Sequence, residues 1–331
     1  MNTQEWNPDS LLQLSGQYWA TCTLHAAVKL DVFTAIGDKP LYSDEIAQKR
    51  NINTEGATRL LNALAAMNLL EKADDKFSNT PAAKAFLSKD SPQYIGHIIT
   101  HHHHLAASWS QLDQAVKTGT PVRASMSHTP PEWRESFLMG MFNMAMNLAP
   151  VLADNIDLSG MHSLLNLGGG PGTYAIHFCQ KNPGLNATVY DLPATRPFAE
   201  KTIEKFGFTD RIDFMEGNYL EEGIEGTYDV AWLSHILHGE GQKECQRIIL
   251  KTVAALKPGG RIIIHDFILN NTMDGPLFPA LFSLNMLLGT SDGQSYSENQ
   301  ITDMLAGAGV KEIHRLDFLG PNDSGIITGM I

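Results

Sequence analysis

From about residue 162 the sequence alternates between short β-rich runs and helical segments. The β-rich runs are SLLNL, ATVYDL, RIDFMEG, YDVAWLS and RIIIHDFIL, and the helical segments between them are TYAIHFCQKN, ATRPFAEKTIEKFG and GQKECQRIILKTVAAL. Strands that alternate with helices predict an α/β fold with a doubly wound parallel sheet. The later segments SENQITDMLAGAG, VKEIHRLDF and GIITGMI predict a further helix and two strands, which we expect to include an antiparallel edge hairpin.

A glycine-rich loop, residues 168–172 (GGGPG), follows the first of these strands. Open α/β sheets bind ligands beyond the carboxyl ends of their strands, where this loop is expected to lie. Its spacing is not the Gly-x-Gly-x-x-Gly of dinucleotide sites, because Thr173 stands at the sixth position from Gly168. The loop also contains no lysine that could bind a phosphate.

Two further strand ends supply groups suited to an adenosine. Asp191 ends the second strand, 23 residues after Gly168, where a carboxylate can accept from both ribose hydroxyls. Asn218 and Tyr219 follow the third strand, where an amide can pair with adenine and an aromatic neighbour can cover it. Together with the loop, these residues favour S-adenosylmethionine over NAD or ATP as the cofactor.

Composition limits the possible partners. The chain of 331 residues has 36 acidic and 24 basic side chains, a formal charge of −12, which disfavours nucleic acid and anionic lipid. We find neither a targeting signal nor eighteen consecutive apolar residues, so we expect a cytoplasmic protein without a membrane span. The widely spaced Cys22, Cys179 and Cys245 indicate neither disulfides nor a zinc ribbon.

The N-terminal part predicts a mainly helical domain with the rhythm of a winged helix. The expected helices are LLQLSGQYWATCTLHAAVKLDVFTAI, SDEIAQKR, NTEGATRLLNALAAMNLLEK and a short FSNTPAAKAFL, and residues 92–150 read as helical throughout. A DNA-reading helix normally carries several basic residues, but the third helix offers Arg59 alone. Packing and dimerisation are therefore favoured over DNA binding.

Five motifs occur in a fixed order: LLNLGGGPGT, VYDLP, EGNYL, ILHGEG and LKPGGRIIIHDF. From about residue 11 to the end, the chain resembles class I S-adenosylmethionine-dependent methyltransferases of the plant-type O-methyltransferase family, which includes caffeic acid and acetylserotonin O-methyltransferases and bacterial small-molecule enzymes. The resemblance implies a winged-helix dimerisation domain (1–100), a helical linker and substrate wall (101–155) and a Rossmann-like cofactor-binding domain (156–331). It also implies a homodimer and a small-molecule methyl acceptor.

The resemblance assigns site residues by position. The predicted cofactor contacts are Gly168, Gly170, Asp191, Leu192, Asn218, Tyr219 and Ser234. Asn166 and Asn218 stand where the family usually has acids, which weakens the attraction for the cofactor's ammonium group. Leu138, Phe142 and Met146 are the predicted substrate wall, which favours a pocket over plain core packing for the methionine cluster Met126, Met139, Met141, Met144 and Met146.

The segment SHILHGEG contains the predicted catalytic base. His238 matches the histidine of the family's Leu-His-Asp-Trp motif, and Asp266 matches the first of two acids that orient this base. The second acid is expected near Ser295, where none stands, although Glu298 follows three residues later. Gly239 and Glu240 replace the family's Asp-Trp. His235, one helical turn before His238, is expected to have a structural role.

Three functions remain open on the sequence. The first is O-methylation of a hydroxyl on a small planar aromatic acceptor, because a histidine can take the proton of a phenol. The second is C- or N-methylation of a pigment, quinone or tetrapyrrole, where alignment matters more than a base. The third is a non-catalytic ligand-binding or winged-helix regulatory protein. We expect no metal, although His97, His101 and His104 would share one helix face.

Overall fold

The computed structural model describes residues 5–123 and 131–331, except the side chains of Pro131, Glu132 and Arg134. Met126 of the methionine cluster therefore lies outside the described residues. The chain forms two compact units, which meet in sequence between Ala106 and Ala107. Each unit is described separately below.

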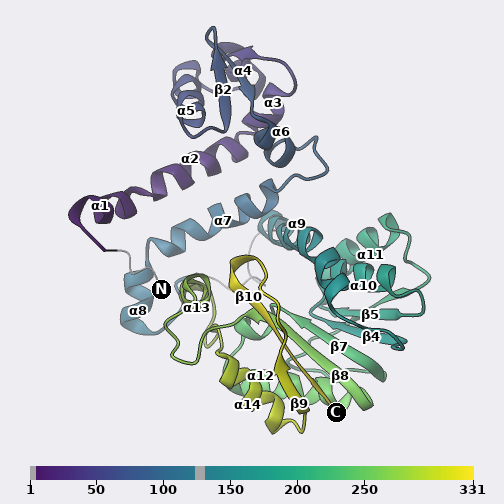
Figure 1. Ribbon diagram of the computed structural model, residues 1–331. Coiled ribbons are helices and arrows are strands. Elements are labelled where there is room, and N and C mark those ends of the chain that lie inside the picture. Colours follow the sequence, from purple (N-terminus) through teal and green to yellow (C-terminus); the bar gives the residue numbers. More distant parts are fainter. Residues whose placement is uncertain (1–4, 124–130) are drawn as a thin grey trace. The chain divides into compact units, whose positions relative to one another are not determined.

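The N-terminal unit contains helices around a small antiparallel sheet (Figure 1). Its elements are α1 (Pro8–Gly16), α2 (Tyr18–Lys29), α3 (Val32–Ile36), β1 (Leu41–Tyr42), α4 (Ser43–Arg50), α5 (Thr54–Ala66), β2 (Leu70–Ala73), β3 (Lys76–Asn79), α6 (Pro81–Leu87) and most of α7 (Gly96–Trp109). The strand order is β1-β3-β2. The three helices α3, α4 and α5 followed by the β2–β3 hairpin form the arrangement typical of a winged helix.

The hairpin corrects two of the predicted helices. We expected LLEK to continue the third helix and FSN to begin the fourth, but the last three residues of LLEK belong to β2 and FSN belongs to β3. Asp74 and Asp75 connect the strands, and both have positive φ, as a two-residue hairpin turn with the twist of its strands requires. Phe77 is buried, while the side chain of Asn79 donates to the Phe33 and Gly37 carbonyls. Tertiary contacts thus override the local helical pattern.

The C-terminal unit confirms the predicted doubly wound sheet. The strands are β4 (Ser163–Leu167), β5 (Asn186–Asp191), β6 (Ile212–Glu216), β7 (Tyr228–Ser234), β8 (Leu256–Phe267), β9 (Lys311–Arg315) and β10 (Ser324–Met330), in the order β6-β5-β4-β7-β8-β10-β9. The first five are parallel, whereas β10 runs antiparallel to both β8 and β9. The expected antiparallel edge hairpin is therefore present.

Helices cover both faces of this sheet (Figure 1). One buried core includes side chains of α12 (Gln242–Ala254) and α14 (Glu298–Gly307), and the other includes α10 (Thr173–Lys181), α11 (Arg196–Lys205) and the end of α9 (Pro131–Asn155). Neighbouring residues of one strand contribute to opposite cores, as Leu164 and Leu165 do. This period of two follows from the pleat of a strand. Because β4 to β8 run parallel, their carboxyl ends all lie at one edge of the sheet.

Residues 107–155 are less continuously helical than predicted. Helix α8 (Leu112–Thr118) ends at Gly119, which has the left-handed conformation common after helices, and residues 120–123 are non-helical. Within α9, Glu135–Asn155 is long and apolar enough to cross a membrane by length and composition alone, a test that core helices also pass. Leu152 and Ala153 of α9 lie in a buried core of this unit. Helix α13 (Leu277–Gly289) was not predicted from the sequence.

Candidate active site

The glycine-rich loop joins β4 to α10 and needs glycine for a steric reason. Gly168 has φ +63°, and a Cβ atom there would lie 2.5 Å from Cγ2 of Ile236. The Gly168 amide donates to the Tyr190 carbonyl on β5 at 2.8 Å, so the loop is held at the end of two adjacent strands. No larger residue could occupy position 168 without moving Ile236, which begins the turn that carries His238.

Asp191 binds the same loop. Its carboxylate accepts from the Gly170 amide at 2.8 Å, the Leu192 amide at 2.7 Å and the Thr195 hydroxyl at 3.0 Å. Burial raises the pKa of Asp191, although these hydrogen bonds oppose that shift. The structure thus brings Gly170 and Asp191 together and leaves the Leu192 side chain exposed.

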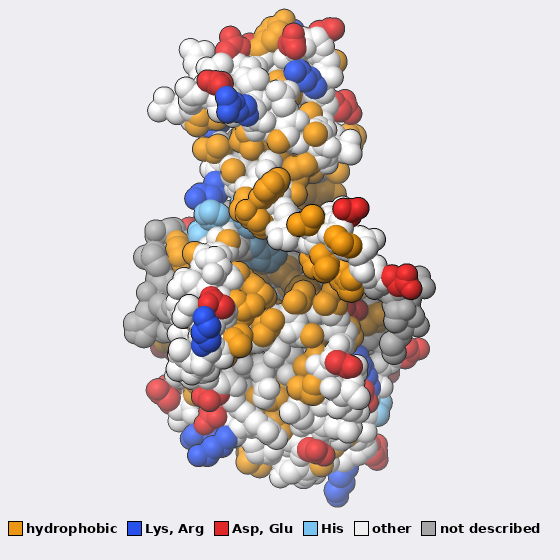
Figure 2. Space-filling view, turned by 90° about the vertical axis from the view of Figure 1, so that its left-hand side faces the viewer, with side chains coloured by type: hydrophobic (Ala, Val, Ile, Leu, Met, Phe, Trp, Pro, Cys, Tyr) orange, Lys and Arg blue, Asp and Glu red, His pale blue; other side chains and the backbone are white. Residues whose placement is uncertain are grey.

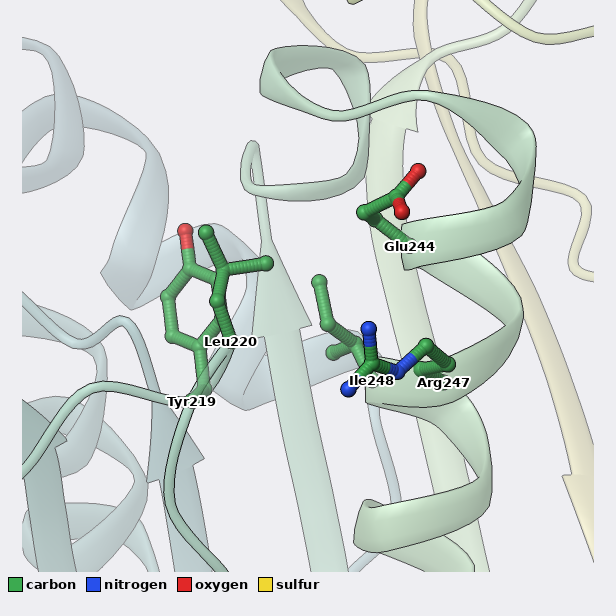
Figure 3. Close-up of a pocket in the computed structure, with 5 residues that line it drawn as sticks. All are labelled: Tyr219, Leu220, Glu244, Arg247 and Ile248. Atoms are coloured by element: carbon green, nitrogen blue, oxygen red, sulfur yellow. The ribbon is translucent and has the colours of Figure 1, made fainter.

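Asn218 and Tyr219 lie in the turn after β6. The Gly217 amide donates to the Asp191 carbonyl at 3.0 Å, which places this turn beside the end of β5. A cavity of about 80 Å³ lies between Tyr219 and Leu220 on the turn and Glu244, Arg247 and Ile248 on α12 (Figure 3). Ligand pockets usually measure about 300–1,000 Å³, so this cavity is too small to be the cofactor site.

Unpaired polar atoms lie beneath the glycine-rich loop. Asn166 is 1% exposed, and its Nδ2 has no hydrogen-bond partner among the described residues. A Cβ atom on Gly169 would lie 2.7 Å from this nitrogen, so the amide packs directly against the loop. The buried Oγ1 of Thr173 is likewise unpaired within the described chain. Buried polar atoms normally have partners, so these two point to a polar ligand group at the loop.

Ser234, a further predicted cofactor contact, is engaged within the sheet. Its hydroxyl lies 2.9 Å from Nδ1 of His265, whose Nε2 lies 3.1 Å from the Ser324 hydroxyl. Burial holds the pKa of His265 well below its usual value, so this ring is neutral. Ser234 therefore belongs to a hydrogen-bonded chain between strands, and its contact with a cofactor stays a prediction.

His238 and Asp266 form a close pair. His238 lies on a single 3-10 turn after β7 (Leu237–Gly239), and Asp266 lies near the end of the adjacent β8. Nδ1 of His238 is 2.7 Å from Oδ1 of Asp266, which also accepts from the Phe267 amide at 2.8 Å. Asp266 is buried, with 4% of the residue exposed, while His238 is partly exposed.

This pair fixes the hydrogen position on the imidazole. An ionised carboxylate only accepts hydrogen bonds, so Nδ1 of His238 carries the hydrogen and Nε2 keeps a free lone pair. Burial alone would raise the pKa of Asp266, but the adjacent imidazoles of His238 and His235 hold it well below the usual range. Nε2 is therefore the atom of His238 that can accept a proton.

His235 lies beside the same acid. Its ring packs 4.4 Å from the rings of both His265 and Phe267, and its Nδ1 is 3.5 Å from Oδ1 of Asp266, beyond a good hydrogen bond. The donor atoms of His235, His238 and Asp266 lie within 4.8 Å of one another, so they could hold one metal ion. The histidines of α7, all of them described, form no such cluster.

Ser295 stands where the family's second acid is expected, and among the described residues no carboxylate other than Asp266 forms an ion pair with His238. Ser295 is fully buried, and its hydroxyl has no partner among the described residues. Glu298 instead pairs with Arg315 at 3.1 Å, at the start of α14. Within the described chain, Asp266 is thus the carboxylate that contacts His238, since His238 forms no other ion pair there.

Sequence reasoning missed an aromatic wall beside His238. The ring of Phe282 on α13 meets the His238 ring edge-on at 4.7 Å and lies 4.7 Å from Phe267, and Phe278 lies 4.9 Å from Phe267. Phe278 and Phe282 share a helix face because they are four residues apart. The apolar stretch LFPALFSLNMLLG with this spacing was the signal that could have revealed them.

The predicted substrate wall occupies one side of α9. Leu138, Phe142 and Met146 follow one another at four-residue intervals, so they project along one helix face. Leu138 is buried, whereas Phe142 and Met146 are partly exposed. Their contact with an acceptor stays a prediction.

Comparison with known proteins gives a consistent result. Residues 105–311 match the family model of the O-methyltransferase domain, and residues 12–89 match that of the O-methyltransferase dimerisation domain. The 3-hydroxy-5-methyl-1-naphthoate 3-O-methyltransferase of Streptomyces sahachiroi is 31% identical, over 98% of this chain and 95% of that protein. The tetracenomycin polyketide synthesis 8-O-methyl transferase TcmO of Streptomyces glaucescens is 30% identical, over 98% of each chain.

A solved structure extends the similarity to the whole fold. PigF with SAH superposes with a TM-score of 0.91 at 25% identity, covering 98% of this chain and 100% of that one. The predicted motifs, the strand order and these matches therefore agree.

Proposed function

The chain belongs to the O-methyltransferase family, and from this membership we propose that it transfers a methyl group from S-adenosylmethionine to a hydroxyl on a small planar aromatic acceptor, with His238 as general base. The observation that supports this role is the 2.7 Å contact between Nδ1 of His238 and the buried Asp266, which leaves Nε2 free. The names of the two bacterial relatives, a hydroxynaphthoate 3-O-methyltransferase and a tetracenomycin polyketide synthesis 8-O-methyl transferase, support the acceptor class.

The residues at the strand ends fit the cofactor. Asn166 and Thr173 offer buried unpaired polar atoms at the glycine-rich loop, where they could meet the polar methionine end. Asp191 would hold the ribose, and Asn218 with Tyr219 the adenine. Leu192, Gly168, Gly170 and Ser234 complete the proposed contacts. When bound, S-adenosylmethionine supplies an electrophilic methyl group.

The protein's own residues would act on the acceptor hydroxyl. Nε2 of His238 would accept the proton that leaves the hydroxyl as the oxygen becomes a nucleophile. Asp266 would hold the ring in place and stabilise the imidazolium that forms. Phe282 and Phe267 would shield the pair from water and contact a planar ring. With Ser295 in place of a second acid, Asp266 would orient the base without that support.

Exposed apolar side chains support a homodimer through the N-terminal unit. Helix α1 has no buried residue, and several large apolar side chains on and beside α1 and α2 are about half exposed or more: Trp6, Leu11, Leu12, Leu14, Tyr18 and Trp19. Exposed apolar patches of this kind mark interaction sites. The match of residues 12–89 to a dimerisation domain supports a second copy of this chain as the occupant.

Several features oppose nucleic acid as a partner. Arg59 of α5 pairs with Glu55 on the same helix, which neutralises the basic residue of the would-be reading helix. On the face shown in Figure 2, Lys and Arg side chains are scattered among Asp and Glu rather than gathered. We propose a cytoplasmic enzyme that acts on a dissolved small molecule.

One experiment tests the function directly. The protein is incubated with methyl-labelled S-adenosylmethionine and a panel of phenols, naphthols, aromatic amines and quinones, and the label is located in the product. We expect label on an aromatic oxygen. Label on carbon or nitrogen would replace this proposal with the C- or N-methylation alternative. Failure to bind S-adenosylmethionine or S-adenosylhomocysteine in calorimetry would favour a non-catalytic protein.

A further inference from the structure

Arg123 is a partly buried cation anchored against α13. The backbone amides of Val122 and Arg123 both donate to the Leu288 carbonyl, at 3.1 and 3.0 Å. The guanidinium donates to the Ser108 hydroxyl at 3.2 Å and to the side-chain and backbone oxygens of Asn285, both at 3.4 Å. Its position is therefore fixed by α13 and by the segment before α8.

The charge of Arg123 has no acidic partner within the described part of the chain. The ion pairs found there do not include it, and burial lowers its pKa without an opposing carboxylate. Its hydrogen bonds to the described residues are few and long for a group with five N–H donors. Arg211 shows the contrast, because its guanidinium donates to three backbone carbonyls at 2.5 to 2.9 Å. A partly buried cation without a counter-ion is costly, which suits a group that receives an anion.

Helix α13 links Arg123 to the catalytic pair. Phe278, Phe282, Asn285 and Gly289 follow at intervals of four, three and four residues, so they share one helix face. Phe282 contacts the His238 ring at 4.7 Å, and Asn285 contacts Arg123. Each residue adds about 1.5 Å along a helix, so the backbone position of Asn285, which contacts Arg123, lies about 4.5 Å further along α13 than that of Phe282, which contacts His238.

A glycine makes room for the guanidinium. A Cβ atom on Gly289 would lie 2.2 Å from Nη2 of Arg123 and 2.7 Å from its Cζ. The same helix face thus carries an aromatic side chain, Phe282, beside His238 and a glycine, Gly289, where the guanidinium of Arg123 packs.

We propose that Arg123 binds a carboxylate carried on the same aromatic system as the methylated hydroxyl, so that the acceptor is a hydroxyaryl carboxylate. This inference rests on the proposed O-methylation at His238. Arginine and carboxylate form paired, charge-assisted hydrogen bonds that fix orientation as well as supply affinity. Arg123 would then decide which hydroxyl of a polycyclic acceptor faces Nε2.

The test separates carboxylate binding from methyl transfer. Wild type, Arg123→Gln and Arg123→Lys are each assayed with 3-hydroxy-1-naphthoate, its primary carboxamide and 2-naphthol. Binding of 1-naphthoate and of 1-naphthamide to the S-adenosylhomocysteine-loaded proteins is measured by calorimetry, a readout that needs no turnover. Lys117→Gln is the matched control, since Lys117 is an exposed cation on α8 paired with Asp113.

For wild type we expect the hydroxynaphthoate to have at least tenfold higher kcat/KM than the carboxamide, mainly through KM, and 1-naphthoate to bind more tightly than 1-naphthamide. Arg123→Gln should abolish both preferences, Arg123→Lys should keep part of them, and Lys117→Gln should change neither. Equal binding of the charged and neutral naphthyl ligands by wild type would overturn the proposal even if Arg123→Gln fails to fold. Methylation of 2-naphthol oxygen in that case would leave the proposed function intact.

Discussion

Nδ1 of His238 lies 2.7 Å from Oδ1 of Asp266; His238 lies in the turn after β7, and Asp266 lies on the adjacent parallel strand β8. The register of these strands pairs Ser234 with His265, so the base and its acid both follow the last paired position. The contact is therefore built from the sheet itself, through a short turn after β7 and the next residue of β8. Such a scaffold holds the imidazole in one orientation without help from a second acid.

The first prediction concerns His238→Ala. The variant should lower kcat on a phenolic acceptor by about 100- to 10,000-fold, because general-base catalysis contributes that much. The dissociation constant of S-adenosylhomocysteine should change less than threefold, since the predicted cofactor contacts lie elsewhere. Steady-state kinetics and calorimetry check the two parts. An unchanged rate on a phenol of ordinary pKa would remove His238 from the mechanism.

The second prediction concerns Asp266→Asn. An amide can donate to Nδ1, which would favour the hydrogen on Nε2 and remove the lone pair that the mechanism needs. We expect kcat to fall by a factor similar to that of His238→Ala, and the double variant to be little worse than either single one. Additive losses in this cycle would show that the two residues act independently.

The pattern of alternating strands and helices was sufficient to predict the sheet. Parallel strands must be joined by long crossover helices, and the strands and the helices each leave a strong hydrophobic pattern in the sequence. The same pattern could not place Arg123, because the residue it contacts on α13, Asn285, lies about 160 residues later in the chain. The hairpin at Asp74 and Asp75 was missed for a related reason. Buried packing of Phe77, rather than local propensity, decides that segment.

The third prediction concerns Asn166→Asp, which restores the acid that the family usually has. A carboxylate buried beneath the loop without a partner should lower the unfolding temperature of the ligand-free protein. It should also attract the cofactor's ammonium group, so S-adenosylmethionine should bind several-fold more tightly. Calorimetry and thermal unfolding with and without ligand check both changes. Asn166→Leu, which removes the polar atom, should instead weaken binding.

The fourth prediction concerns Gly168→Ala. The added Cβ would strain a backbone with φ +63° and press against Ile236 at 2.5 Å. We expect a loss of about 1–3 kcal/mol in the free energy of unfolding and at least tenfold weaker cofactor binding, because the displaced loop also carries Gly170. Gly223→Ala is the control, since Gly223 has open space around its Cα and no positive φ. Equal effects of the two substitutions would contradict the steric account.

The final prediction concerns the pH dependence contributed by Asp229, far from the proposed chemistry. Its carboxylate accepts from the amides of His162 and Ser163, at 2.8 and 2.9 Å, and lies 2.7 Å from Nζ of Lys257. Although partial burial alone would raise its pKa, the hydrogen bonds from Lys257, His162 and Ser163 lower the pKa of Asp229 to about 2. The pairing thus anchors the start of β4 to β7.

A folded pKa below the unfolded value of about 3.9 adds stability that is fully present above the unfolded pKa and lost as pH falls towards the folded one. Two pKa units correspond to about 2.7 kcal/mol, and partial exposure reduces this to about 1–2 kcal/mol. Asp229→Asn should therefore be less stable than wild type by that amount in urea unfolding at pH 7. The difference should shrink between pH 5 and pH 3, whereas the exposed control Asp213→Asn should show no such trend. A difference that stays constant across this range would mean that Asp229 acts through packing rather than through its charge.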